Sequence, residues 1–167
     1  MADITIDDAG FVYLRLYILP RIKPMSTHLP YKVDTGANRT TISKVLLNKL
    51  GYDDEWIRQG ELLIGKEKPT TATGEIISDC YKIVLPEIRL GKWTGHNWSF
   101  LVRLNDDKKK QFRLLFGTDS MRFFKWTFDY ESKVCSYEGI EGKQLTNYSN
   151  KEQSLHSLDK LSNEIVI

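Results

Sequence analysis

The sequence is poor in cysteine and histidine and has almost no excess of either charge. Its 167 residues include 2 cysteines and 3 histidines, and 24 Lys and Arg residues nearly balance 22 Asp and Glu residues, for a net charge of +2. The well-separated Cys80 and Cys135 favour reduced thiols over a disulfide framework. The histidines show no metal-ligand spacing, so no metal or cofactor is expected. The charge balance gives no reason to expect a nucleic acid as partner.

Long hydrophobic runs are also missing. No apolar stretch approaches the roughly 20 residues that span a bilayer, and residues 1–8 are acidic where a secretory signal would be basic. We therefore expect no membrane partner and a cytoplasmic location. The sequence contains no motif of a serine hydrolase, a P-loop NTPase or a zinc peptidase, which leaves these three enzyme classes without support.

Short segments rich in β-branched and aromatic residues follow one another closely, with turn residues between them. This pattern predicts an all-β barrel or sandwich with little helix. The expected strands are residues 11–19, 31–33, 62–65, 81–90, 98–104 and 112–116, followed by a hairpin of 126–130 and 133–137. Helices are expected at 44–50, capped by Ser43, and at about 119–124, with a further turn possible at 53–59. Pro86 is expected at an edge or bulge, and Gly91 and Gly95 on either side of a turn.

The chain length fits one domain with some additional residues. We expect residues 1–138 to form the domain and 139–167 to form a C-terminal tail rich in Asn, Ser, Lys, Glu and Gln. Leu155, Leu158, Leu161 and Ile165 are spaced like one face of a helix. The tail is therefore either mobile or a marginal amphipathic helix, and two regulatory roles are open: occupying the active-site cleft or adding to a dimer contact.

The segment Asp34-Thr35-Gly36-Ala37 follows an apolar strand and is the sharpest chemical signal. Gly36 permits a turn in which backbone amides approach the Asp34 carboxylate, and it leaves room for a substrate backbone. Thr35 can donate a hydrogen bond that braces the loop. The alternative is an Asx turn in which Asp34 and Gly36 serve only to end the strand.

Two more features follow in order: a candidate hairpin over residues 70–77 and the segment 114–121, Leu-Leu-Phe-Gly-Thr-Asp-Ser-Met. Together with the Asp34 motif they resemble the retropepsin-like aspartic proteases, which include retroviral-type and DNA-damage-inducible-type enzymes. The resemblance covers about residues 11–138. It implies a closed acid-protease-like β-barrel with one or two short helices and one lobe per chain. It also implies a flap containing Thr73, Gly74 and Glu75, and supporting residues beside the active site at Leu115, Gly117 and Asp119.

The chain departs from the family pattern at three positions. Phe116 stands where the family usually has Ile or Leu. Thr118 replaces an Arg of the retroviral type, and Asn38 replaces the acid with which that Arg pairs. Because both halves of the ion pair are missing, the loop must be braced differently, and Arg39 and Asp119 are the two candidates.

The resemblance implies an aspartic endopeptidase that hydrolyses a peptide or protein substrate, with Asp34 as the catalytic residue and no cofactor. Two carboxylates are needed to activate water and to protonate the reacting carbonyl. The chain has no second Asp-Thr/Ser-Gly segment, so the partner would be Asp34 of a second subunit in a symmetric homodimer. Thr35 would then bond across the two-fold axis. The alternative is a non-catalytic protease-fold domain used for dimerisation or peptide binding.

Overall fold

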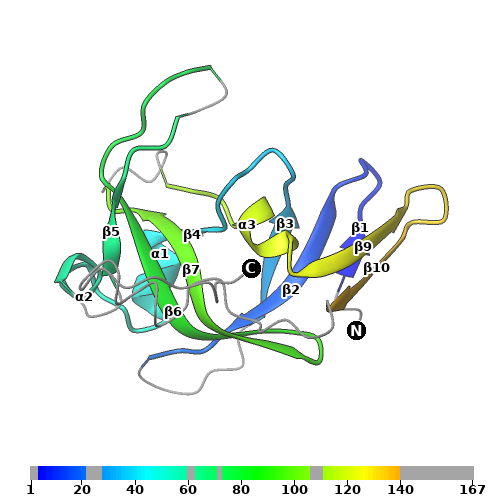
Figure 1. Ribbon diagram of the computed structural model, residues 1–167, viewed down its shortest axis with the longest axis horizontal. Coiled ribbons are helices and arrows are strands. Elements are labelled where there is room, and N and C mark those ends of the chain that lie inside the picture. Colours follow the sequence, from blue (N-terminus) through cyan, green and yellow to red (C-terminus); the bar gives the residue numbers. More distant parts are fainter. Residues whose placement is uncertain (1–3, 22–27, 60–62, 71–72, 106–110, 140–167) are drawn as a thin grey trace.

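The computed structural model describes residues 4–21, 28–59, 63–70, 73–105 and 111–139 (Figure 1). Apart from Gly139, the expected C-terminal tail lies outside the described residues. The strands are β1 (Ile4–Ile6), β2 (Val12–Ile18), β3 (His28–Val33), β4 (Thr41–Ser43), β5 (Leu63–Glu67), β6 (Cys80–Leu90), β7 (Trp93–Arg103), β8 (Leu115–Phe116), β9 (Phe124–Asp129) and β10 (Val134–Gly139). The helices are α1 (Lys44–Lys49), α2 (Asp54–Gln59) and α3 (Thr118–Met121).

Eight of the strands form one strongly curved sheet that nearly closes into a barrel (Figure 1). Its order is β4-β7-β6-β2-β3-β8, with β1 added to β2 and β5 added to β6, while β9 and β10 form a separate hairpin. The predicted all-β barrel is therefore confirmed. Two short strands, β1 and β4, were not predicted. The described residues contain three short helices: two near the expected 44–50 and 119–124, and α2 where a further turn was thought possible at 53–59.

The long β6–β7 hairpin corrects two expectations about single residues. Gly91 lies in the turn, but Gly95 lies inside β7 opposite Ile88. A Cβ at Gly95 would come within 2.5 Å of the Trp98 ring, so close packing rather than a turn requires glycine there. Pro86 is within interior strand β6, between the segment paired with β5 and the segment paired with β2. Neither of those strands pairs with Pro86, so its missing N–H is tolerated.

The core follows from alternation of side chains along the strands. In β2 every second residue from Val12 to Ile18 is buried, as expected when one face of a strand covers a core. Trp98 and Phe100 of β7 are 1% exposed and lie in the same core. Within the described residues, no helix is long and apolar enough to cross a membrane.

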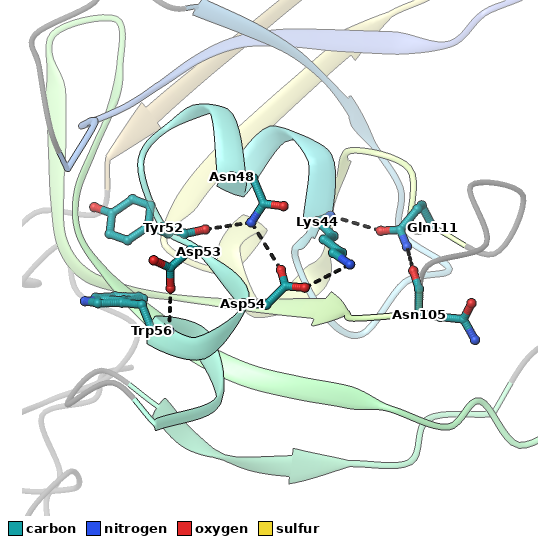
Figure 2. A network of polar contacts seen from close by, with 8 residues as sticks. All are labelled: Lys44, Asn48, Tyr52, Asp53, Asp54, Trp56, Asn105 and Gln111. Atoms are coloured by element: carbon teal, nitrogen blue, oxygen red, sulfur yellow. Dashed lines mark hydrogen bonds and ion pairs between the residues drawn. The ribbon is translucent and has the colours of Figure 1, made fainter.

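A network of polar contacts holds α1 and α2 together (Figure 2). The Asn48 side-chain amide donates to the Tyr52 carbonyl at 2.8 Å and to the Asp54 carboxylate at 3.2 Å. Asp54 also pairs with the Lys44 ammonium at 2.9 Å. The Lys44 backbone N–H donates to the Gln111 side chain at 3.0 Å. These contacts therefore anchor the start of the 111–114 segment to the helices.

The β9–β10 hairpin presents aromatic side chains to the barrel on one face. Trp126 donates its indole N–H to the Met121 carbonyl at 2.8 Å, and its ring lies parallel to that of Phe128 at 6.0 Å. Gly139, at the end of β10, approaches Trp93 so closely that a Cβ would lie 2.6 Å from the ring. The predicted final hairpin is confirmed, and its open end packs against α3 and β7.

Candidate active site

The Asp34 motif is positioned by two strands that are far apart in the sequence. β3 pairs in parallel with β8, so that Val33 lies opposite Phe116. The Asp34 backbone N–H donates to the Phe116 carbonyl at 3.1 Å. The parallel pair therefore brings the Asp34 loop beside Gly117, as the order of the motifs suggested.

The loop itself fixes the carboxylate of Asp34. The Gly36 N–H donates to Asp34 Oδ1 at 2.9 Å, and the Ala37 N–H donates to the Asp34 carbonyl at 3.1 Å. A Cβ at Gly36 would lie 3.2 Å from the same Oδ1, which is a tighter approach than side chains usually make. Asp34 is half-buried, so the carboxylate is oriented by the backbone and still reachable.

Bracing from beneath comes from Thr40 rather than from Thr35. Thr35 is exposed, and its hydroxyl makes no hydrogen bond to any residue that the structure describes. Thr40 is fully buried; its hydroxyl accepts from the Gly117 N–H at 3.2 Å and donates to Asp119 Oδ1 at 2.7 Å. The Thr40 hydroxyl also contacts Ser120, whose hydroxyl accepts from the Trp98 indole N–H at 2.8 Å. A chain of buried polar contacts therefore joins the loop to α3 and β7.

Gly117 lies where the two backbones cross most closely. A Cβ there would come within 2.5 Å of the Arg39 carbonyl oxygen and 2.8 Å of the Ala37 carbonyl oxygen. The next residue, Thr118, donates its N–H to the Ala37 carbonyl at 2.9 Å. The segments around Ala37 and Gly117 are therefore interlocked backbone to backbone.

Asp119 and Arg39, the two candidates for bracing the loop, act on different sides of it. Burial raises the pKa of Asp119, against the lowering effects of the Thr40 hydrogen bonds and the Arg39 charge. Arg39 instead makes a forked ion pair with Glu67 at the end of β5, with Nε–Oε2 and Nη2–Oε1 both at 3.3 Å. Asp119 thus supports the loop from below, and Arg39 ties it to the start of the 68–79 segment.

The expected hairpin is present in its described part. Thr70 and Ile76 form an antiparallel bridge, and the Ile77 N–H donates to the Pro69 carbonyl at 2.8 Å. Gly74 has a φ of +88°, a left-handed conformation that favours glycine. Thr73, Gly74 and Glu75 are all exposed, and Figure 1 shows this green segment projecting beyond β5 and β6.

A cleft of about 540 Å³ lies between the loop and the base of this hairpin. Its lining comes from the loop, the hairpin and three neighbouring segments: Gly36, Ala37, Asn38, Arg39, Thr41, Glu67, Lys68, Pro69, Thr70, Ile77, Leu101, Phe112 and Leu115. Asp34 is beside the cleft, two residues before its first lining residue. Of the other predicted site residues, Gly36, Ala37 and Leu115 line the cleft, Gly117 and Asp119 support the loop, and Thr73 to Glu75 lie outside the lining.

Several residues of the site were missed by sequence reasoning. Thr40, Ser120 and Trp98 build the buried support, and Glu67 and Lys68 contribute charge to the cleft. Nothing local marks them, because their partners are far away in the sequence. Among the described residues, no group of three or more His, Cys, Asp and Glu side chains could hold a metal ion.

Comparisons with known proteins agree with this geometry. The sequence model of the family described as aspartyl protease matches residues 26–120, more than half of the chain. Among solved structures, the chain is similar to a retropepsin-like aspartic protease from Rickettsia conorii, with a TM-score of 0.51 and 20% sequence identity over 83% of this chain and 90% of that one. No curated protein matches the sequence significantly. The chain belongs to the aspartyl protease family and has a retropepsin-like fold.

Proposed function

We propose that this chain is an aspartic endopeptidase that acts as a symmetric homodimer, with one Asp34 from each copy. The observation that carries the proposal is the Gly36 N–H that holds Asp34 Oδ1 at 2.9 Å, at the edge of a cleft of about 540 Å³. A cleft of this size is within the range of known ligand sites, about 300–1,000 Å³. An oriented carboxylate beside such a cleft suits the activation of water against a bound peptide.

The reaction would need no covalent intermediate. Two carboxylates a few ångströms apart do not both ionise readily, so the pair shares one proton. The charged Asp34 takes a proton from the attacking water, while the protonated Asp34 of the second copy donates a hydrogen bond to the carbonyl oxygen as negative charge develops on it. The tetrahedral intermediate then collapses with cleavage of its C–N bond, and the Asp34 that took the proton from water passes it to the leaving nitrogen.

A second copy is required because the sequence contains only one Asp-Thr-Gly segment. The exposed Thr35 next to Asp34 is available for a contact across the two-fold axis. A closed two-fold pair would place the same residue from both copies at one site.

The 70–77 hairpin is proposed as the flap over the bound peptide. Pro69, Thr70 and Ile77 of its base line the same cleft as Ala37. Ile76 is 64% exposed, so an apolar side chain is available to contact the substrate and to exclude water from it. We further propose a cytoplasmic location, which the free thiols of Cys80 and Cys135 support.

The proposal is tested by Asp34→Asn against a peptide library, with Asp53→Asn as matched control. Asp53 accepts from the Trp56 N–H at 2.7 Å, at the start of α2, and Asn is an equally good residue at that position. We expect Asp34→Asn to lose at least about a thousandfold in kcat, since subsidiary binding alone supplies little rate, and Asp53→Asn to cleave like wild type.

Cleavage that survives Asp34→Asn would overturn the aspartic mechanism. A folded wild-type dimer that cleaves nothing at any pH would instead favour the non-catalytic alternative of dimerisation or peptide binding. Removing residues 142–167 and measuring both mass in solution and cleavage tests whether the C-terminal tail regulates the enzyme. No change in either measurement would contradict that role.

A further inference from the structure

The cleft carries an uneven set of charges. Among its described lining residues, three have charged side chains: Arg39, Glu67 and Lys68. Two cations and one anion give these described lining residues a net charge of +1. The Asp34 carboxylate lies beside the cleft but is not among these lining residues.

The negative charge of Glu67 is already compensated. Each of its two carboxylate oxygens accepts one N–H of the Arg39 guanidinium at 3.3 Å. The Glu67 side chain is 25% exposed and that of Arg39 is 41% exposed. The carboxylate is therefore less accessible to a substrate than the guanidinium is. A basic substrate side chain would have to compete with Arg39 for the same oxygens.

Lys68 is different, because it follows Glu67 directly and is exposed. Its ammonium has no acidic partner among the residues that the structure describes. An ammonium is a strongly hydrated charge that a flexible stem can bring to an incoming carboxylate. Among the described lining residues, the unpaired positive charge is therefore that of Lys68.

Part of the cleft wall is apolar. Ile77, Leu101, Phe112 and Leu115 line it next to the charged residues. Walls of low dielectric constant strengthen the field of a charge that lies at their edge. In its described part, the cleft thus combines the unpaired Lys68 cation with an apolar wall.

We propose that this cleft selects peptides that place an acidic side chain against Lys68 and an apolar side chain against the wall formed by Ile77, Leu101, Phe112 and Leu115. The inference rests on the proposed function, because it takes a peptide as the ligand. It adds a substrate class, and it makes Lys68 a determinant of specificity. The Arg39–Glu67 pair positions the segment that carries Lys68.

The test starts from a peptide that wild type cleaves, selected from a random library. Each position on either side of the scissile bond is replaced in turn by Glu, Gln and Lys, and kcat/KM is measured for each peptide. We expect one position at which Glu exceeds Lys by about threefold to fivefold, the size that an exposed ion pair supports. This preference should weaken at high salt, since exposed charges are screened.

Lys68→Glu should reverse the preference at that position, and Lys68→Gln should abolish it. Lys92→Glu is the matched control, because Lys92 is exposed in the turn at the other end of β7 from the cleft residue Leu101; it should keep the wild-type preference. A preference for Lys at that position, or a preference for Glu that survives Lys68→Glu, would overturn the inference.

Binding of the same peptides to Asp34→Asn, measured by fluorescence anisotropy, separates this inference from the proposed function. If wild type cleaves nothing, the binding series uses library peptides chosen by affinity. If the Glu peptide binds more tightly than the Lys peptide, and Lys68→Glu reverses that order, the acidic preference is supported. The absence of cleavage then contradicts only the proposed catalysis. If kcat/KM or affinity is the same for the Glu, Gln and Lys peptides at every position, the proposed acidic preference is wrong, and the proposed peptidase function is unaffected.

Discussion

At the scale of single residues, the crossing of two backbones at Gly117 limits what can replace it. We expect Gly117→Ala to lower the free energy of unfolding by about 1–3 kcal/mol, because the new Cβ forces apart segments that have no room for it. The carbonyl oxygens of Arg39 and Ala37 would lie 2.5 Å and 2.8 Å from that Cβ. Since the same shift displaces the Asp34 loop, cleavage should fall as well.

Gly65→Ala is the matched control, measured by the same urea titration. A Cβ at Gly65 meets no atom within 4 Å, so its effect should stay below about 1 kcal/mol. Equal losses for the two variants would show that the close approach at Gly117 is not what destabilises the protein.

Asp119 allows a prediction about pH. Burial raises its pKa, so the folded protein binds this proton more tightly than the unfolded chain does. The free energy of unfolding therefore falls as pH rises from the ordinary aspartate pKa through the raised one. Asp119→Asn keeps an acceptor for the Thr40 hydroxyl and removes the buried charge, so it should be at least as stable as wild type at pH 7.

The advantage of Asp119→Asn should shrink as pH falls through the folded-state pKa, and thermal unfolding at a series of pH values measures it. Asp119→Ala is the contrast: it leaves the buried Thr40 hydroxyl without this acceptor and should cost about 1–3 kcal/mol. An advantage for Asp119→Asn that grows toward acid pH would contradict the assigned role of burial.

At the scale of secondary-structure elements, short helices need contacts outside themselves. α1 and α2 have six residues each, which is too short for stability in isolation. The Asn48 amide links them through the Tyr52 carbonyl and the Asp54 carboxylate (Figure 2). The hydrogen bonds of one side chain thus tie the two helices to each other.

We expect Asn48→Ala to lower the free energy of unfolding by about 1–2 kcal/mol, since two hydrogen bonds are lost, one of them to a charged group. Lys49→Ala, an exposed position in the same helix, should change it by less than about 0.5 kcal/mol. Chemical denaturation of both variants provides the comparison. Similar values would show that Asn48 contributes no more than a surface residue.

At the scale of the whole molecule, the proposed dimer predicts how mixed subunits behave. If both Asp34 carboxylates are needed, wild-type chains equilibrated with excess Asp34→Asn chains should lose activity as the square of the wild-type fraction, because only pairs of two wild-type chains are active. Activity is measured at constant total protein after subunit exchange. A linear decrease would mean that each chain carries a complete site.

Much of the architecture could be predicted because it follows from the types and spacing of neighbouring residues. The strand expected at residues 11–19, the cap at Ser43 and the final hairpin of β9 and β10 each reflect a short-range pattern, and each appeared close to its expected place. The incorrect or missing predictions concern Gly95 and the two short strands β1 and β4. Gly95 resembled a turn residue, but a neighbouring ring explains it. The strands β1 and β4 have three residues each, too few for a clear alternation.

The sequence by itself determined the all-β class and the Asp34 motif, because each depends on residue type and order along the chain. Only the tertiary structure decided that Thr40 supports the loop, that Arg39 pairs with Glu67 and that Lys68 faces the cleft without an acidic partner among the described residues. These contacts join residues separated by whole strands. The register of the sheet and the burial of side chains determine which of these residues meet, and both exist only in the folded chain.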